Sequence, residues 1–352
     1  MQAIYRITAD GQDITDLLND RLLSLRTTDK PGMESDECEL RLDDRDGAIV
    51  LPRRGAALEI SLGYRGQPLT LIGRYTVDEI EVSGPPQSLV ITGKAADMRA
   101  SAKSSRRAAW ENLPLSTIVA TIAARHGWRP ACRVQAQIAR ADQNNESDIH
   151  FLSRLARQYN ATAKVAGDTL LVLPRQGGTS ASGKALAAVQ LVRADLRSYS
   201  VRFNDCAMQG AVKAAWHNKK TAKLEVLEVP NPDAPPGTRP THVDRHVYPD
   251  KARAAAAAKA RLAAFNRATA EVRLELSGRA DLVAERMLRL TGIKTGIDGD
   301  YLIDSVEHQF DFSGGWQTTV TCNGGKTGKA KAGLKRKKKA KATTVLKVPD
   351  PQ

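Results

Sequence analysis

The sequence predicts a mainly β protein of the α+β class, with two antiparallel β-barrels, a small helical insert between them and a disordered basic C-terminal tail. Three observations predict it. A strand–turn–strand pattern occurs twice, period-2 alternation with glycine turns dominates residues 1–100 and recurs within residues 166–325, and helical patterns occur at 101–165 and 251–269 of the 352-residue chain. The length is sufficient for two or three domains.

The repeated pattern is nine residues long and its two copies begin at Gly73 and Gly299, 226 residues apart. Four residue types recur at the same offsets. They are Gly73, Tyr75, Asp78 and Glu81 in the first copy, and Gly299, Tyr301, Asp304 and Glu307 in the second. Each copy is followed by a Gly-containing turn and a second alternating run. Strands use few residue types, so chance similarity is the alternative explanation. The hypothesis is that one small β-domain is present twice.

Residues 1–100 are expected to form the first barrel and residues 101–165 the helical insert. Cys38 to Leu42 alternate cleanly, as in a half-buried strand. In the insert, an apolar run follows Pro114 and ends before Gly127, the asymmetry typical of a helix. A second helix is expected to begin at Ser147, which can cap its first turn.

Residues 166–325 are expected to form the second barrel, with a Pro-rich connection at 229–241 and a helix at 251–269 capped by Asp250. Residues 326–352 carry ten basic residues and one acidic residue, which is most of the net charge of +14. With almost nothing to bury, this segment is expected to be disordered and to serve as an interaction tail. Its basic cluster consists of Lys335, Arg336, Lys337, Lys338 and Lys339.

The residue types and their spacing favour no catalytic, cofactor-binding or metal-binding residue. The four cysteines are far apart, which disfavours metal or disulfide frameworks. His242 and His246 have metal-ligand spacing but stand among prolines, without an indicated third ligand. His308 lies in the second copy of the repeat and is expected on an exposed strand face. No apolar run reaches 18 residues and no Sec-type signal begins the chain, so we expect no membrane insertion. We expect the protein to be made in the cytoplasm and to stay there or leave by lysis.

Three segments resemble the phage late control protein D family. Glu146 to Ala156 resemble its ESD-x-x-FL-x-RLA helix, Ile118 to Trp128 resemble the preceding helix, and Gly299 to Thr318 resemble its C-terminal hairpin. Proteins of this family are baseplate hubs of contractile tails, related to the hub region of type VI secretion spike proteins. The resemblance spans about residues 1–325 and leaves the basic tail outside.

The resemblance implies a structural hub in the particle of a contractile phage or of a headless, phage-derived bacteriocin (a tailocin). The hub is expected to be a homotrimer in which each chain supplies two barrels similar to the tail tube protein. Such a ring would join the sixfold tail tube to the threefold central spike, among other baseplate proteins and possibly the tape measure protein.

Two other functions stay open on the sequence. A late regulatory protein would bind DNA through the basic tail, but no aromatic residues interleave with the lysines and no recognition helix is found, which disfavours nucleic acid. Docking to an acidic protein surface, or solvation alone, are the competing explanations of the tail. A tail-associated cell-wall hydrolase would need a catalytic acid or a metal in a cleft.

Overall fold

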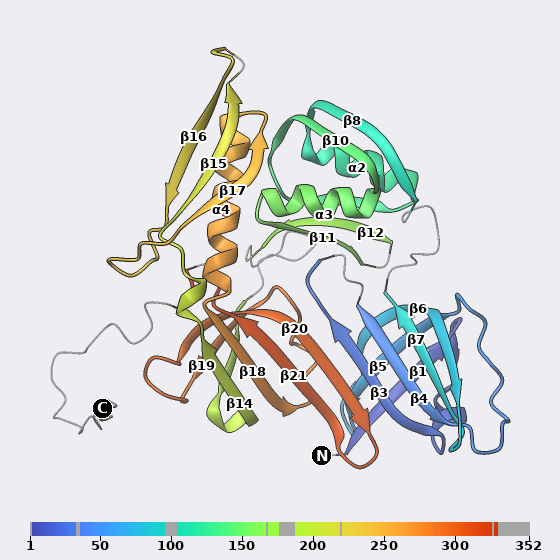
Figure 1. Ribbon diagram of the computed structural model, residues 1–352. Coiled ribbons are helices and arrows are strands. Elements are labelled where there is room, and N and C mark those ends of the chain that lie inside the picture. The colour runs from blue at the N-terminus through green and yellow to red at the C-terminus, as the bar shows by residue number, and fades with distance from the viewer. Residues whose placement is uncertain are drawn as a thin grey trace, which may run out of the picture.

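The computed structural model describes residues 2–32, 36–95, 104–166, 168–175, 187–218, 220–325 and 327–329. These residues form a mainly β molecule with four hydrophobic cores (Figure 1). The predicted class, mainly β with some helix, is confirmed. The basic cluster from Lys335 to Lys339 lies outside the described residues.

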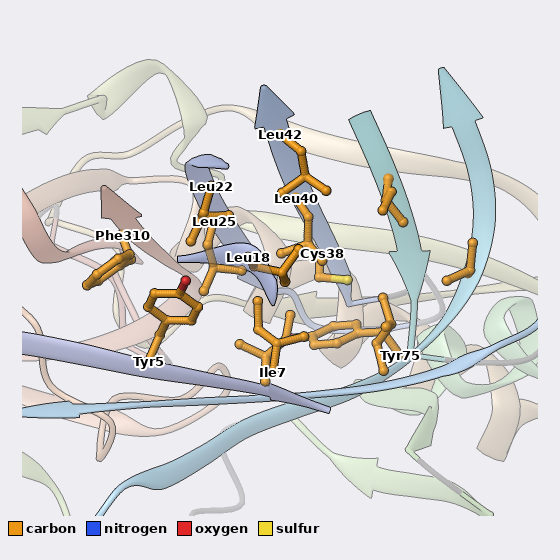
Figure 2. Packing of buried hydrophobic residues seen from close by; sticks show 14 of the residues in the cluster. Tyr5, Ile7, Leu18, Leu22, Leu25, Cys38, Leu40, Leu42, Tyr75 and Phe310 are labelled. Carbon is orange, nitrogen blue, oxygen red and sulfur yellow. The ribbon is translucent and has the colours of Figure 1, made fainter. Parts of the chain in front are cut away.

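The first unit is a twisted sheet with the strand order β3-β4-β7-β6-β5-β1-β2. Alternate residues of its strands point inward, where Ile7, Leu25 and Tyr75 meet (Figure 2). Its elements are β1 (Ala3–Ala9), β2 (Gln12–Asp13), α1 (Thr15–Leu18), β3 (Leu22–Asp29), β4 (Glu37–Asp43), β5 (Ala57–Tyr64), β6 (Thr70–Ser83) and β7 (Ser88–Lys94).

The second unit packs two helices against two small sheets, β10-β8 and β11-β12-β9. The two helices were expected from the sequence, but β8, β9 and β10 were not. Ile118 and Phe151, one from each helix, are fully buried in the shared core. The elements are β8 (Ser105–Pro114), α2 (Leu115–Arg125), β9 (Arg129–Cys132), β10 (Gln137–Ser147), α3 (Asp148–Gln158), β11 (Ala161–Ala166) and β12 (Thr169–Pro174).

The third unit has the strand order β14-β18-β21-β20, with β19 paired to β20 and β13 paired to β19. Its core contains Val272, Tyr301 and Val320. Its elements are β13 (Val189–Val192), the 3₁₀ turn η2 (Arg193–Asp195), β14 (Leu196–Phe203), β18 (Ala270–Ser277), β19 (Met287–Thr291), β20 (Gly299–Asp311) and β21 (Gly315–Asn323).

A fourth unit projects from the third and consists of a three-stranded sheet, β16-β15-β17, packed on the long helix α4. Small side chains let α4 lie close to β15, where Ala254 and Ala258 meet Val212. The Asp250 carboxylate caps the helix by accepting a hydrogen bond from the Arg253 amide at 2.8 Å. The elements are η3 (Asp205–Ala207), β15 (Ala211–Asn218), β16 (Lys223–Pro230), β17 (Thr241–Tyr248) and α4 (Lys251–Arg267).

The expectation of two closed antiparallel barrels is wrong in detail. The described strands of the first and third units form one open sheet of 13 strands, joined where β20 pairs with β3. Strand β20 is long enough to take two partners on one side, β19 along its first residues and β3 along its last. The sheet is also not purely antiparallel, because β13 runs parallel to β19.

Candidate assembly surfaces of the two strand units

The first and third units have the same internal strand order. The order β3-β4-β7-β6-β5-β1 of the first matches the order β14-β18-β21-β20-β19-β13 of the third. The strand directions agree except at the last strand, because β1 runs antiparallel to β5 whereas β13 runs parallel to β19. The register agrees as well. Tyr75 lies opposite Leu58 of the preceding strand, and Tyr301 lies opposite Leu288. The two copies of the nine-residue repeat therefore occupy the same place in two similar sheets, on β6 and β20.

The two tyrosines of the repeat are core residues of their units. Tyr75 and Tyr301 are both buried, and burial raises the pKa of both phenols, that of Tyr301 to about 12. Gly73 is required by its tyrosine, since a Cβ at Gly73 would stand 2.4 Å from the Tyr75 hydroxyl oxygen. Gly299 has a φ of +148° and a different neighbour, the Lys329 ammonium group. Gly73, Tyr75 and Tyr301 therefore serve the packing inside their units and do not form a surface for a partner protein.

The aspartates of the repeat mark a β-bulge in each unit. The β6–β7 register shifts between Val77 and Glu79, at Asp78. The β20–β21 register shifts at the equivalent residue, Asp304. A bulge bends its strand and increases the local twist. Each carboxylate contacts the equivalent residue of the next strand: Asp78 contacts Lys94 at 2.9 Å, and Asp304 accepts a hydrogen bond from Asn323 at 3.2 Å.

A pair of oppositely charged residues also occurs in both units with its signs exchanged. Arg74 of β6 contacts Glu59 of β5 at 2.7 Å. At the equivalent positions, Asp300 of β20 contacts Arg289 of β19 at 2.7 Å. Aligning the two copies of the repeat did not reveal this pair, because the residues at these positions are not identical. What the two sheets have in common here is that the facing residues carry opposite charges.

The two units also differ at the glutamates of the repeat. Glu307 lies in the part of β20 that pairs with β3, opposite Thr28, and its carboxylate is 3.6 Å from the Arg26 guanidinium. Glu81 lies at the equivalent position of β6, where the described residues include no strand on that side, and it is exposed.

His308 is buried, so its expected place on an exposed face is wrong. Its Nδ1 lies 2.9 Å from the Thr318 hydroxyl, and the Trp316 indole N–H donates to the same nitrogen at 3.3 Å. Burial lowers the pKa of His308 to about 4. The burial arises because β3 crosses this part of β20, with Thr27 opposite His308. A strand that pairs from about 280 residues away in the sequence leaves no local signal.

Phe310 holds the third unit to the first by packing into the hydrophobic core of the first unit. It belongs to β20 of the third unit, yet it packs in the core of the first, with its ring centroid 5.0 Å from that of Tyr5 (Figure 2). Trp316 of β21 joins the same core and lies against Tyr64. The β20–β3 joint is therefore a packed interface as well as a ladder of backbone hydrogen bonds.

Charged groups hold the helical insert to this joint. The Lys164 ammonium group of β11 contacts the carboxylates of Asp29 and Asp36 at 2.7 and 2.8 Å. Burial works against its charge, but the two carboxylates outweigh burial and raise the pKa of Lys164. Asp29 also accepts a hydrogen bond from the Ala284 amide at 2.7 Å, so one residue at the end of β3 touches three units.

The Glu146-Ser147-Asp148 sequence stands at the start of α3, where each of its side chains has a structural role. The Ser147 hydroxyl caps the helix by accepting from the His150 amide at 3.2 Å, as predicted. The Glu146 carboxylate binds Arg154, one helical turn beyond His150. Arg154 also donates to the Asp142 carbonyl at 2.9 Å, which holds its side chain against β10.

Asp148 is a buried carboxylate that links α3 to the end of α2. It accepts from Gln143 at 2.9 Å, lies 2.9 Å from the His126 Nε2 and 3.3 Å from Arg125. Burial alone would raise the pKa of Asp148, but the hydrogen bonds from Gln143 and His126 and the Arg125 charge lower it. The histidine of the HGW segment and the aspartate of the ESD segment thus act as one structural pair.

The remaining candidate residues fall on separate elements. His242 and His246 lie on β17, a strand rather than a helix, and their rings contact Phe265 and Tyr248 respectively in edge-to-face geometry. Among the described residues, no group of three His, Cys, Asp or Glu side chains could hold a metal ion. Within the same residues, no helix is both long and apolar enough to span a membrane.

Comparison with known proteins agrees with this geometry. Residues 40–313 match the model of the phage tail baseplate hub (GPD) family. The chain is 33% identical to a probable baseplate hub protein of Escherichia phage 186, over 88% of this chain and 90% of that protein. These matches confirm the resemblance inferred from the sequence.

Two solved structures show the same fold at low sequence identity. The 43 kDa tail protein of prophage MuSo2 from Shewanella oneidensis superposes with a TM-score of 0.68 at 15% identity, covering 91% of this chain and 98% of that one. An E. coli protein described as a component of the type VI secretion system gives a TM-score of 0.54 at 12% identity, covering 90% and 76% respectively.

Proposed function

The chain belongs to the phage tail baseplate hub family, and we propose that it forms a homotrimer that joins a sixfold tail tube to a threefold central spike. Family membership makes it a structural component of a tail baseplate. The trimer, the sixfold and threefold symmetries and the partner proteins are our proposal.

The observation that carries the proposal is the pair of sister sheets in one chain. They share strand order, the register between β5 and β6 or β19 and β20, the bulge position and a pair of opposite charges at equivalent positions, and they lie side by side in a continuous sheet (Figure 1). Three such chains arranged around an axis present six similar units. Closed cyclic symmetry then lets one face of the ring approximate sixfold geometry while the chains remain threefold.

The proposed role is mechanical, with no bond made or broken. Two buried titratable groups of the described residues, His308 at the joint and Asp148 at α3, are hydrogen-bonded to other side chains. His308 is bonded to Thr318, and Asp148 is bonded to His126. We propose that the protein is assembled in the bacterial cytoplasm and resides in the baseplate of a phage or tailocin. The tape measure protein and other baseplate proteins are further proposed partners.

Co-expression with the central spike protein from the same tail cluster tests this role. Light scattering on the purified complex should give three copies of this chain for each spike trimer. A complex with one copy, or no complex, would contradict it. A zymogram on peptidoglycan and a salt titration of DNA binding, with and without residues 326–352, test the hydrolase and regulatory alternatives.

A further inference from the structure

We propose that the cleft between α3 and α4 binds an acidic segment of a partner protein, whose carboxylates pair with Arg157, Arg261 and Arg267. We call it the arginine cleft. It lies within one chain, between the second and fourth units, so the inference does not depend on the trimer proposed above.

The arginine cleft is a cavity of about 480 Å³. The two helices that flank it lie against each other (Figure 1), and β17 contributes to its wall. A second cavity of about 620 Å³ adjoins it, and the two cavities share Arg157, Ala161 and Arg175 in their lining. The space is larger than a single small anion would fill.

Positive charge gathers in this cleft. Among the described residues of its lining, one is an acid, Asp244, and five are arginines: Arg154, Arg157, Arg175, Arg261 and Arg267. The Asp244 carboxylate is already engaged, because it accepts a hydrogen bond from the Tyr248 hydroxyl at 2.9 Å. A cleft lined by charge of one sign concentrates ligands of the opposite sign.

Two of the five arginines have a carboxylate partner. Arg154 pairs with Glu146, and Arg175 contacts Glu285 at 3.0 Å. No ion pair with a carboxylate that the structure describes is formed by the other three, Arg157, Arg261 and Arg267. The cleft therefore has guanidinium groups to spare for a ligand, and these groups bind carboxylates through paired hydrogen bonds.

Arg267 is the residue that points most directly to a bound anion. It is 7% exposed, and its guanidinium donates to the Asn160 Oδ1 at 2.8 Å, although such a group has five N–H donors. Glu285 and Asp304 favour its charge from beyond ion-pair distance. Burial and the neighbouring Arg175 lower the pKa of Arg267 to about 10, so it is still charged at neutral pH. A buried charge without a close partner is costly, and a bound carboxylate would remove that cost.

The floor of the cleft favours a peptide over an inorganic polyanion. It contains Ala257, Ala260 and Ala264, on the face of α4 that lies between Arg261 and Arg267. Small apolar side chains allow close approach and can be covered by the apolar part of a peptide, whereas a polyphosphate has no apolar surface to bury. The separation of the two arginines along α4 is about 9 Å, which is close to the length of three residues in an extended chain. We therefore expect acids about three positions apart in the bound segment.

The ends of the two helices are the competing explanation for Arg157 and Arg267. Both residues stand in the last turn of their helices, where the helix dipole favours a cation. That effect does not extend to Arg261, which precedes the last turn of α4. The test therefore includes Arg261.

Fluorescence anisotropy of a labelled decapeptide of glutamate tests the site on the full-length chain at low salt. The main variant combines Arg157→Gln with Arg261→Gln, and both residues are exposed, so the fold should be retained. It should bind the peptide about tenfold more weakly than the wild type. Equal affinity of the two proteins would overturn the proposal.

A matched control separates the cleft from the basic C-terminal segment. Lys337→Gln with Lys338→Gln removes the same charge outside the cleft and should change the affinity less than the cleft variant does. A larger loss in this control would overturn the proposal, because it would place the peptide on the basic cluster. Unlabelled polyphosphate with the same number of charges should compete less well than unlabelled oligoglutamate, and better competition by polyphosphate would overturn the choice of a peptide.

Arg267→Gln tests the buried charge and keeps a hydrogen-bond donor for Asn160. Saturating oligoglutamate should raise the melting temperature of the wild type, because it binds the folded chain, and should raise that of the variant less. An equal rise in both would show that Arg267 takes no part in binding.

The outcomes distinguish this inference from the proposed function. A wild-type chain that does not bind oligoglutamate would overturn the arginine cleft and leave the hub role intact. A chain that binds the peptide through the cleft but stays monomeric with its spike present would overturn the trimeric hub and leave the cleft standing.

Discussion

Protonation of His308 should loosen the joint between the two strand units. In the folded protein, burial lowers the pKa of His308 to about 4, against 6.5 for a free imidazole. A lowered pKa of a base means that the folded state resists protonation. Stability is therefore full above pH 6.5 and is lost as the pH falls toward 4. The fall in pKa corresponds to about 3 kcal/mol in total, of which about 2 kcal/mol is lost by pH 5.

The assay is urea unfolding at pH 7.5 and pH 5.0, followed by the fluorescence of the four tryptophans. His308→Gln removes the titrating group, so between these two pH values the wild type should lose about 2 kcal/mol more stability than the variant. The same substitution at His217, which is exposed, is the control and should leave the pH dependence unchanged. Equal losses in the wild type and in His308→Gln would refute the reasoning, because they would mean that His308 is not buried at the joint.

Three further substitutions and one deletion test other parts of the structure. Phe310→Ala should cost about 3–5 kcal/mol in urea unfolding, because it empties a buried site, whereas Phe312→Ala, at an exposed neighbour, should cost at most about 1 kcal/mol. Asp148→Asn should cost about 3 kcal/mol and weaken the contact between α2 and α3, seen as faster amide exchange in both helices; unchanged exchange would contradict its role. Gly73→Ala should lower the melting temperature, because its Cβ meets the Tyr75 hydroxyl, and Tyr75→Phe in the same chain should recover part of the loss; a neutral Gly73→Ala would contradict the packing described. Deletion of residues 326–352 should leave the number of chains per spike complex unchanged by light scattering, and loss of the trimer would assign the tail to assembly.

Local patterns in the sequence predicted much of the fold. Ser147 and Asp250 were identified as helix caps, and both accept the expected backbone hydrogen bonds. Caps act within one helical turn, so a short sequence window contains the whole interaction. Alternation likewise identified strands such as β4 and β18, because their outward residues are polar and their inward residues apolar.

Pairing between distant segments could not be predicted in this way. Alternation states which face of a strand is buried, but not which other strand lies along its edge. The joint between β20 and β3 therefore stayed hidden, and with it the burial of His308 and the open sheet in place of two closed barrels. Strands β8 and β10 were missed because they are short of apolar residues and pair mainly with each other.

In the two strand units, too, features set by nearby residues could be predicted and features set by distant strands could not. The repeat placed Tyr75 and Tyr301 at equivalent positions, because the sheet around each tyrosine imposes the same packing. No local pattern indicates that Val82 is exposed while His308 is covered. That difference depends on β3, which pairs with β20 and has no equivalent along β6 among the described residues.

Three-dimensional reconstruction of the assembled baseplate from electron micrographs tests the central claim most directly. The account predicts a ring of six strand units around the tail axis, supplied by three chains, with the first and third units alternating. A ring built from six chains with one unit each at the axis would contradict it, as would a density in which the two units of one chain lie at unrelated distances from the axis.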